Sequence, residues 1–576
     1  MPGATFYRVS SNPDGVTGFT ALAASSDKLI ATAYDWDIGV HRINWPQAQF
    51  LLEACDADIC LLSANISALN VMLGTVGYFK ASNPGSGDFF GNSVALSGDG
   101  NTLAVGAHHE ASATTGINST PNVLAAVAGA VYVYTRSGTT WAQQAYVKAS
   151  NTGGGDNFGD ADALSADGNT LVVGAQGEAS ANVGITPGAP TDAATLNVAP
   201  SSGAVYVFTR SGTTWSQQAY VKASNTEAGD LFGSSVALSA DGSTLAVGAY
   251  SEDGMKTGVT PGAPAETDAL NGASESGAVY VYTRSGTTWS QQAYVKASNT
   301  EVNDMFGISV ALSGNGNTLA VGAYAEDSAN IGVIPGAPNE ASTLNGASFS
   351  GAVYVYIRSG TTWNQQAYVK ASNTGASDLF GSAVALSADG NTLAIGASGE
   401  GSVDIGVTPG APNEAATGNG AGSSGAVYVM NRSGTTWSQQ AYVKASNTGA
   451  GDAFGYSVAL SADGNTLAVG AYNEGSANTG VMPGIPNETT TLNDAAFSGA
   501  VYLYARSTAT WSQQAYVKAS NTGNGDLFGR AVTLSADGNT LAAGAQYESS
   551  AATGVSNTTP GQSDNSVAAA GAVYLY

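Results

Sequence analysis

The sequence predicts an all-β protein, in which four-stranded antiparallel sheets repeat around one axis as in a seven-bladed β-propeller. The first observation is a repeated Phe-Gly pair, whose copies follow one another after 68 residues and then at a constant step of 74 residues. The pairs begin at Phe90, Phe158, Phe232, Phe306, Phe380, Phe454 and Phe528. The second observation is that each repeat holds four short apolar runs bounded by Gly, Asn, Asp and Ser, which is typical of strands. Radial packing suits so many sheets because it leaves few open edges.

The four strands of one repeat are clearest in the unit around Phe380, where they are "FGSAVALS", "NTLAIGA", "GAVYVM" and "WSQQAYVKAS". Asp-Gly in "ADGN" predicts a tight hairpin between the first two strands, and "RSGTT" is nearly as short between the last two. In "FGSSVALS" the large residues Phe232, Val236 and Leu238 share one face, and the other face carries small residues. We therefore expect adjacent sheets to interdigitate with both faces buried.

The two ends of the repeated region predict how the ring closes. The last repeat stops after its third strand, "GAVYLY", at Tyr576. The segment "VGYFKAS" at residues 76–82 matches a fourth strand but precedes the first Phe-Gly pair. We expect residues 76–81 to pair antiparallel with residues 572–576 as the outer strand of the last sheet, which hides an exposed edge. The propeller then occupies residues 71–576.

The motif order Phe-Gly, strand, Asp-Gly, strand ending in Gly-Ala and then "GAVYVY" resembles FG-GAP repeats, the unit of the integrin α-subunit propeller and of many bacterial surface proteins. The resemblance covers residues 76–576. It implies a propeller with a binding or adhesion role. One departure is that Gly-Ala is never followed by Pro. The residues found there are His108, Gln176, Tyr250, Tyr324, Ser398, Tyr472 and Gln546.

The second departure concerns calcium. The family's D-x-D-x-D-G loop between the first two strands is absent, and only "ADGN", or "GNGN" at Gly314, occupies its place. One carboxylate cannot supply the roughly six to eight oxygens that calcium prefers. We therefore do not carry calcium binding by that loop over from the family. We expect no cofactor, with calcium as the alternative.

Residues 1–70 do not match the repeat. The stretches "ATFYRVSSNPDGV" and "QFLLEACDADICLLSANISAL" resemble the middle and end of a bacterial fibronectin type III domain, a β-sandwich, here truncated because its first strand would precede Met1. Trp45-Pro46 adds to the resemblance. Cys55 and Cys60 flank a predicted hairpin tip. They either form a disulfide, as in an exported protein, or remain two free thiols.

Composition and charge favour an extracellular or cell-surface location. Only 11% of the residues are charged, Gly numbers 75, and the net charge is −25. Such an acidic surface would repel the phosphates of nucleic acid, so we expect no nucleic-acid partner. No signal peptide is visible in "MPGATFYRVS", and no run approaches the roughly 18 apolar residues of a membrane span. The partners that remain are a protein or glycan ligand at the cell surface, or further copies of the chain.

The connection between the second and third strands is long, for example at residues 250–276, and we expect these connections to share one face of the disc. Five of them contain Pro-Gly-Ala-Pro or Pro-Gly-Ile-Pro, at Pro187, Pro261, Pro335, Pro409 and Pro483. Structureless loops longer than about 12–15 residues are usually functional or disordered. The face is therefore either a recognition surface or a structural layer.

Two carboxylates recur in every repeat at this face. An Asp lies two residues before Phe, at Asp88, Asp156, Asp230, Asp304, Asp378, Asp452 and Asp526. A Glu lies three residues after Gly-Ala, at Glu110, Glu178, Glu252, Glu326, Glu400, Glu474 and Glu548. They are candidates for a ring of cation or ligand sites, although the sequence predicts no specific metal site. The structural alternative is that Asp accepts backbone N–H groups of its turn, and that Glu pairs with an equally recurrent Lys.

Six tryptophans are expected at the opposite face, after "RSGTT" or a variant. They are Trp141, Trp215, Trp289, Trp363, Trp437 and Trp511. They could stack on sugars, or they could pack on the neighbouring sheet with Arg136, Arg210 and their equivalents as cation–π partners.

An enzyme needs one distinct set of residues, but the repeats hardly differ. The exceptions are His108-His109 in the first repeat, Asp160 and Asp162 in the second, and Met255-Lys256 in the third. With three histidines in all, the sequence contains no recognisable triad or zinc set. We therefore expect a non-enzymatic, exported binding or adhesion module. A structural component of a cell-surface array is the alternative, and a glycan-processing enzyme is a third class.

Overall fold

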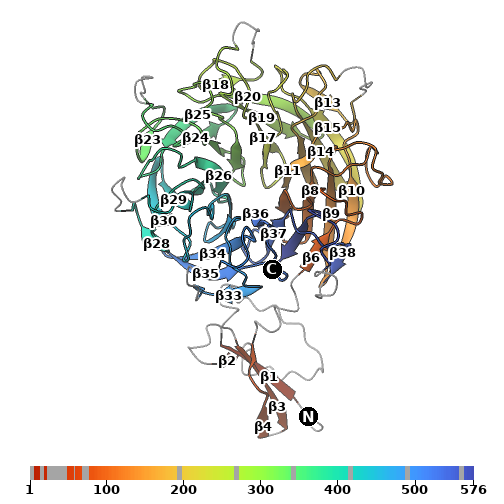
Figure 1. The fold of residues 1–576 in the computed structure, drawn as a ribbon, viewed down its shortest axis with the longest axis vertical. Helices are drawn as coiled ribbons and strands as arrows, with labels where there is room; N and C mark the ends of the chain where they lie inside the picture. The colour runs from red at the N-terminus through yellow and green to blue at the C-terminus, as the bar shows by residue number, and fades with distance from the viewer. Residues whose placement is uncertain are drawn as a thin grey trace.

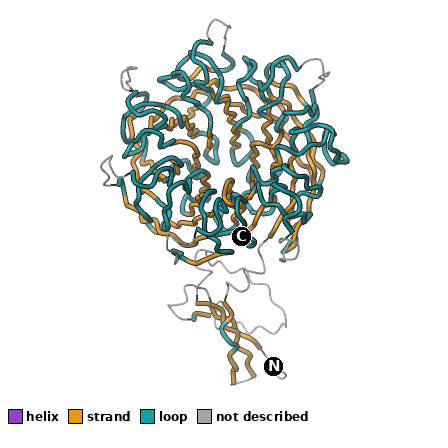
Figure 2. Tube along the Cα trace, in the orientation of Figure 1, coloured by secondary structure: helices purple, strands orange, loops and turns teal. Residues whose placement is uncertain are grey.

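The computed structural model describes residues 6–12, 19–21, 49–56, 59–67, 77–190, 197–264, 271–338, 345–412, 419–486, 493–556 and 564–576. Within these ranges all regular secondary structure is β-strand (Figures 1 and 2), which confirms the predicted all-β class. The described part of the chain accordingly contains no helix long and apolar enough to cross a membrane.

Seven antiparallel sheets repeat along the chain after one smaller sheet. The first repeated sheet contains β7 (Val94–Leu96), β8 (Thr102–Ala107), β9 (Ala130–Ser137) and β10 (Thr140–Val147). The second contains β11 (Phe158–Leu164), β12 (Thr170–Ala175), β13 (Ile185–Pro187), β14 (Ala204–Ser211) and β15 (Thr214–Val221). The third contains β16 (Ser235–Leu238), β17 (Thr244–Ala249), β18 (Val259–Pro261), β19 (Ala278–Ser285) and β20 (Thr288–Val295). The fourth contains β21 (Ser309–Leu312), β22 (Thr318–Ala323), β23 (Val333–Pro335), β24 (Ala352–Ser359) and β25 (Thr362–Val369). The fifth contains β26 (Phe380–Leu386), β27 (Thr392–Ala397), β28 (Val407–Pro409), β29 (Ala426–Ser433) and β30 (Thr436–Val443). The sixth contains β31 (Ser457–Leu460), β32 (Thr466–Ala471), β33 (Val481–Pro483), β34 (Ala500–Ser507) and β35 (Thr510–Val517). The last contains β36 (Phe528–Leu534), β37 (Leu541–Ala545), β38 (Gly554–Ser556), β39 (Ala572–Leu575) and β6 (Gly77–Lys80).

Six of the seven repeated sheets have five strands, so the prediction of four strands per sheet was incomplete. The additional strand comes from the connection between the second and third strands. In the second sheet this strand, β13, pairs outside β15 with the register Ile185 to Val221 and Pro187 to Ala219. Each long connection leaves and re-enters its sheet at the expected end, because the last residue of the second strand pairs with the first residue of the third, as Ala249 does with Ala278. Part of the connection also covers the outer edge of its own sheet, which we did not expect. Proline suits this position because the outermost strand has no further partner for its N–H group.

The sheets surround a common axis, with the first strand of each sheet innermost (Figure 1). Consecutive first strands contact one another from β7 through β36, and β36 contacts β7 in turn. The turns that end the first strands are joined by backbone hydrogen bonds in which each N–H donates to the carbonyl of the next sheet at 2.8–2.9 Å. The order is Gly98, Ala166, Ala240, Gly314, Ala388, Ala462, Ala536 and back to Gly98. This hydrogen-bonded ring is closed.

The last sheet joins the two ends of the repeated region, and the pairing expected from the sequence is present. Strand β6 pairs antiparallel with β39, with the register Phe79 to Val573 and Tyr78 to Tyr574. Contrary to expectation β6 is not outermost, because β38 pairs on its other side with the register Val555 to Phe79. The edge that a three-stranded sheet would expose is thus covered twice.

The glycine of the Phe-Gly pair and the glycine of Gly-Ala recur in every repeat, and each has a structural reason. Gly233 of the Phe-Gly pair has a φ of 89°, a left-handed conformation that favours glycine. The glycine of Gly-Ala allows close approach of the next sheet, because a Cβ on Gly248 would lie 2.1 Å from the carbonyl oxygen of Gly307. The same contact joins the last sheet to the first, where a Cβ on Gly544 would lie 2.0 Å from the oxygen of Gly91.

The hydrophobic cores lie between adjacent sheets. In one of them Val205 and Val221 of the second sheet pack with Phe232, Tyr280 and Trp289 of the third. All five are at most 5% exposed, and the Phe232 and Tyr280 rings meet edge to face at 5.2 Å. Both faces of each sheet are therefore buried against a neighbour, as the alternation of large and small residues predicted.

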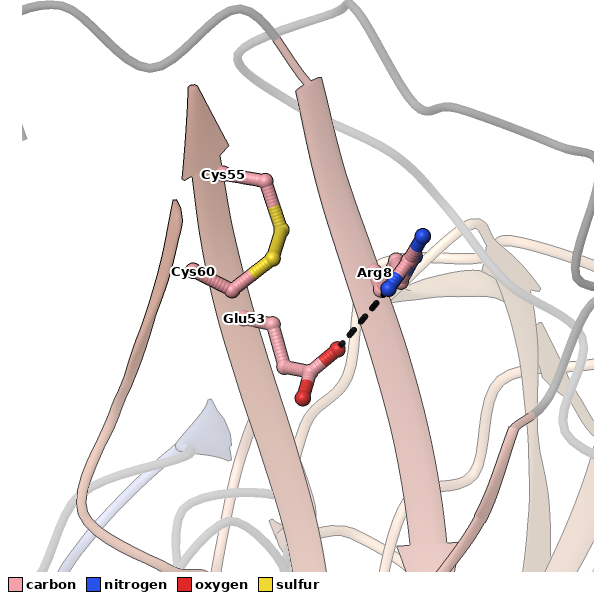
Figure 3. Close-up of a disulfide and its surroundings, with 4 residues drawn as sticks. All are labelled: Arg8, Glu53, Cys55 and Cys60. Carbon is pink, nitrogen blue, oxygen red and sulfur yellow. Dashed lines mark ion pairs between the residues drawn. A yellow bond between two sulfur atoms is a disulfide. The ribbon is translucent and has the colours of Figure 1, made fainter. Parts of the chain in front are cut away.

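The small N-terminal sheet has the order β2-β1-β3-β4, with β5 also paired to β3. Its strands are β1 (Phe6–Asn12), β2 (Thr20–Ala21), β3 (Gln49–Asp56), β4 (Ile59–Leu62) and β5 (Ile66–Ser67). Cys55 and Cys60 face each other across β3 and β4 and form a disulfide (Figure 3). The nearby ion pair of Arg8 and Glu53, at 3.9 Å, is solvent-exposed and contributes little. Trp45-Pro46, part of the fibronectin resemblance, lies outside the described residues.

Candidate functional site

All seven predicted glutamates are buried, and each forms an ion pair with a buried lysine of its own sheet. In the fifth sheet Glu400 Oε2 accepts a hydrogen bond from Lys444 Nζ at 2.8 Å, and both side chains are 1% exposed. Lys444 also donates to Ser424 Oγ at 2.8 Å. The other pairs, at 2.7–3.0 Å, are Glu110–Lys148, Glu178–Lys222, Glu252–Lys296, Glu326–Lys370, Glu474–Lys518 and Glu548–Lys80.

The remaining acceptor positions of the glutamate are also used inside the sheet. Glu400 Oε1 accepts hydrogen bonds from Asn373 Nδ2 at 3.2 Å and from the Ser402 backbone N–H at 3.1 Å. Asn373 Oδ1 in turn accepts the Tyr428 hydroxyl at 2.6 Å. Through these partners the carboxylate links the third strand, which carries Tyr428, the end of the fourth strand next to Lys444, and the connection before the first strand, which carries Asn373. This arrangement supports the structural alternative for the glutamates, because both oxygens already have partners inside the protein.

Burial and ion pairing oppose each other in this network. At Glu252 burial raises the pKa, but the charge and hydrogen bond of Lys296 and the hydroxyl of Tyr294 lower it more, so the pKa lies below its usual value. The carboxylate is therefore ionised, and it depends on the ammonium group beside it. Removing one partner of such a buried pair leaves an uncompensated charge, at a cost of about 3–5 kcal/mol.

The seven predicted aspartates each accept a backbone N–H group of the preceding turn. Asp378 Oδ2 accepts the Gly375 N–H at 2.7 Å. The equivalent bonds, at 2.6–2.9 Å, are received by Asp88, Asp156, Asp230, Asp304, Asp452 and Asp526. Burial raises the pKa of Asp230 and of Asp304 to about 8. Because one carboxylate oxygen of each aspartate already accepts a backbone N–H group of its turn, the geometry supports the structural alternative of turn formation.

The turn that replaces the family's calcium loop is closed by its own side chains. Asp389 Oδ1 accepts the Ser387 hydroxyl at 2.5 Å and the Asn391 N–H at 2.9 Å. Partial burial raises the pKa of Asp389, but these hydrogen bonds outweigh it, and the pKa lies below its usual range. In the fourth sheet Asn315 accepts the equivalent bonds from Ser313 and Asn317, each at 2.9 Å. This turn position therefore requires a hydrogen-bond acceptor, which Asp and Asn both supply, and does not require a negative charge.

The tryptophans of the opposite face are buried between neighbouring sheets. Trp437 is 4% exposed, and its Nε1 donates to Gln366 Oε1 of the preceding sheet at 2.8 Å. The guanidinium of Arg432 lies 5.3 Å from its ring centroid. Trp141, Trp215, Trp289, Trp363 and Trp511 have the same arginine contact at 5.3–5.6 Å. These contacts favour the packing alternative over sugar stacking.

The repeats differ at two positions close to the axis. The position after Phe-Gly holds Asn92, Asp160, Ser234, Ile308, Ser382, Tyr456 and Arg530. The position after Gly-Ala holds His108, Gln176, Tyr250, Tyr324, Ser398, Tyr472 and Gln546. The first position opens the innermost strand and the second ends its antiparallel neighbour, so both lie at the same end of the sheets. This is the end opposite the closed backbone ring.

Side chains from different sheets meet at these positions. The guanidinium of Arg530 lies 5.1 Å from the ring centroid of Tyr456 and 5.8 Å from that of Tyr472, and the two rings are 4.4 Å apart. Asn92 Nδ2 donates to Asp160 Oδ1 at 3.1 Å. Burial raises the pKa of Asp160 to about 6, against the opposing effects of Asn92 and of the Arg530 charge.

Asp162 and His108 are half-buried and lie at or next to the same variable positions. Asp162 Oδ2 accepts the Ser93 hydroxyl at 2.6 Å, and burial together with the Asp160 charge raises the pKa of Asp162 to about 8. His108 stacks on Phe89 with 5.5 Å between ring centroids. Burial lowers the pKa of His108 to about 3, and the charges of His109 and then of Arg530 add to this effect.

We call Asp160, Asp162, His108, Tyr456, Tyr472 and Arg530 the axial cluster. The sequence had indicated both aspartates and His108 as breaks in the repeat, but it did not bring them together. Tyr456 and Arg530 were missed, although a comparison of the repeats position by position marks them as variable. Among the described residues the one group with metal-ligand spacing is Glu53, Cys55 and Cys60, whose cysteines are bonded to each other.

The FG-GAP repeat model matches residues 76–134, 215–282, 289–356, 363–430 and 437–482, which together make up more than half of the chain. The chain belongs to the FG-GAP repeat family. The first matched FG-GAP segment includes the closing strand β6, and the four later ones each begin at or next to the buried tryptophan of a fourth strand.

No curated protein sequence matches the chain. Among solved structures, the FG-GAP chain is similar to the periplasmic gluconolactonase PpgL of Pseudomonas aeruginosa, with 13% identity, a TM-score of 0.39, and coverage of 90% of this chain and 98% of the other. It is also similar to the WD40 repeats of RRP9, with 8% identity, a TM-score of 0.41, and coverage of 87% and 96%.

Proposed function

We propose that this FG-GAP protein is a seven-bladed β-propeller that acts as a non-enzymatic, exported binding or adhesion module. Its ligand is a protein or a glycan at the cell surface. The binding face is the end of the propeller where the Phe-Gly pairs and the long connections lie. Each repeated sheet is one blade, and the closed ring of backbone hydrogen bonds from Gly98 through Ala536 supports the number of blades.

The observation that supports binding at this face is a contrast between two sets of residues. The residues that are the same in every repeat have partners inside the protein, as Glu400 has with Lys444. The residues that differ between repeats gather around the axis at the same end and are mostly half-buried. Folding requires similar contacts in each blade, whereas recognition of a single ligand requires a surface without sevenfold symmetry. The variable residues are therefore the better candidates for recognition.

Export and the identity of the small N-terminal domain belong to the same proposal. The disulfide between Cys55 and Cys60 suits an oxidising compartment. The net charge of −25 keeps a secreted protein soluble and disfavours nucleic acid as a partner. The strand pairing of β1, β3 and β4 is compatible with the end of a fibronectin type III-like sandwich.

A glycan array and an array of extracellular matrix proteins, both probed with the labelled full chain, test the proposal. Reproducible binding on either array is the expected result. Blank arrays, together with turnover of a glycan substrate, would refute a non-enzymatic binding role and would favour a glycan-processing enzyme.

Assembly into a surface array is the second candidate function, and a separate observation favours it. Val183, Ile331, Ile405 and Ile485 lie on the connections beside the short fifth strands and are 63–67% exposed. Apolar side chains near the outer edge could join neighbouring copies. Sedimentation velocity at increasing protein concentration separates the two functions. Blank arrays with ordered self-association would favour assembly, and a monomer that binds on an array would favour recognition.

A further inference from the structure

We propose that the axial cluster is a binding site for a neutral saccharide unit. The proposal rests on the function proposed above and specifies its ligand. The cluster combines tyrosine rings with hydrogen-bonding side chains at positions where the repeats differ from one another. Its residues come from the first, second, sixth and last sheets, so a single ligand would contact groups that are far apart in the sequence.

Several polar atoms of this region are buried and have no hydrogen-bond partner within the protein. They are His108 Nδ1, Asp162 Oδ1 and Gln546 Oε1. Gln546 is 5% exposed and takes the same repeat position as His108 and Tyr472. An unsatisfied buried polar atom costs about 1–3 kcal/mol, so a ligand that supplies the missing bonds gains affinity. Saccharide hydroxyls both donate and accept hydrogen bonds, and therefore suit all three atoms.

The aromatic groups provide the second part of such a site. Tyr456 and Tyr472 lie in edge contact with a centroid distance of 4.4 Å and are half-buried, as is Tyr324 at the equivalent position of the fourth sheet. Tyr547, next to Gln546, is 41% exposed. Tyrosine combines an apolar ring face with a polar hydroxyl. The C–H face of a pyranose ring can pack on such a surface while its hydroxyls reach the polar atoms, and ligand sites commonly combine the two.

The charges present exclude the other simple ligand classes. A cation would compete with Arg530, whose guanidinium already occupies the tyrosine faces at 5.1 and 5.8 Å. An anion would approach a chain of net charge −25 next to Asp160 and Asp162. A metal ion lacks a ligand set, because none of the groups of described residues with metal-ligand spacing involves the axial cluster.

Saturation-transfer NMR on the full chain tests the proposal with defined probes. The probes are the methyl glycosides of glucose, galactose and mannose, N-acetylglucosamine, and the tetrasaccharides of cellulose, chitin and starch. At least one neutral probe should show transfer. Glucosamine and glucuronate should bind at least about tenfold more weakly than their neutral counterparts, which is a difference of 1.4 kcal/mol.

Variants locate the bound saccharide. Tyr472→Ala and Asp162→Asn should each weaken binding of the responding probe about tenfold or more. Tyr472→Phe keeps the ring and should bind within about threefold of the unchanged chain. Ser398→Ala, at the same repeat position as Tyr472 but in the fifth sheet, is the matched control and should bind normally. Melting curves show whether each variant is folded, and Asp162→Asn, which preserves shape, keeps the test decisive if Tyr472→Ala unfolds.

Two results would overturn the saccharide site. One is the absence of transfer to every neutral probe, and the other is transfer that Tyr472→Ala and Asp162→Asn leave unchanged. Neither result would by itself remove the proposed binding function. That function would survive if the labelled chain still bound on the glycan or matrix-protein array and the axial variants bound equally well.

Discussion

The strand that closes the ring contains a pair of residues found in none of the other six fourth strands. Gly77 and Phe79 of β6 stand where the other fourth strands have Ala and Val, as in Ala219 and Val221. Phe79 is fully buried, and its ring meets Tyr134 and Trp141 edge to face at 5.2 and 5.4 Å. A Cβ on Gly77 would lie 2.7 Å from Phe79 Cε2. The two residues therefore fit only as a pair, and we predict that their substitutions are strongly coupled.

The magnitudes follow from the atoms added or removed. Gly77→Ala forces a methyl group against a packed ring, and overpacking of this kind costs about 1–3 kcal/mol. Phe79→Val removes four buried carbon atoms, which at about 0.8 kcal/mol per methylene is about 3 kcal/mol. The double variant recreates the Ala and Val pair of the other sheets, so it should cost only about 2 kcal/mol. The two single costs add to about 4–6 kcal/mol, so the coupling between the two sites should be at least about 2 kcal/mol.

The assay must report on the closing sheet, because unfolding of seven sheets need not be two-state. Hydrogen exchange of the amides in β6 and β39 gives the free energy of local opening. Urea unfolding followed by tryptophan fluorescence gives the global value. The matched control is the reverse exchange in the second sheet, Ala219→Gly with Val221→Phe, which should be tolerated as a pair. Additive costs in β6, or a Gly77→Ala variant as stable as the unchanged chain, would refute the reasoning.

Four further predictions concern closure, the recurrent carboxylates and metal. Deletion of residues 1–82 should open the ring and expose β39, so light scattering should show association and the melting temperature should fall; a monomer with unchanged melting contradicts this. Glu400→Gln should cost about 3–5 kcal/mol in urea unfolding. Together with Asp378→Asn it should lower stability more than affinity on the arrays, and lost affinity at unchanged stability would restore these residues as ligand groups. Because burial raises the pKa of Asp304 to about 8, compared with about 3.9 unfolded, the folded state retains a proton and this contribution to stability is lost as pH rises from about 4 to 8. Asp304→Asn should therefore gain stability relative to the unchanged chain between pH 5 and pH 8, and a difference that is the same at both pH values would contradict it. Finally, a chelator should shift melting little, and a shift above about 10 °C would show that calcium contributes.

Local sequence by itself determined the class of fold and the number of repeated units. Tight turns and short strands are encoded by residues that are close together in the sequence. The turn signal "ADGN" and the Phe-Gly spacing were therefore sufficient to predict antiparallel sheets at a constant period. Residues 76–82 match a fourth strand but precede the first repeat, and the last repeat lacks a fourth strand of its own. This predicted that they pair with β39, because the last sheet would otherwise expose its edge. The pairing of Glu400 with Lys444 followed from equal recurrence and opposite charge.

Only the tertiary structure decided where the long connections run and which variable residues meet. Strand β13 is three residues long, and its pairing depends on β15 more than on its own sequence. In the axial cluster Arg530 of the last sheet contacts Tyr456 and Tyr472 of the sixth sheet, and no local pattern relates residues from different sheets. The features that all repeats share made the fold predictable, but they carry no information about the positions at which the repeats differ. Closing the ring brings these positions around one axis, and their shared environment exists only in the folded chain.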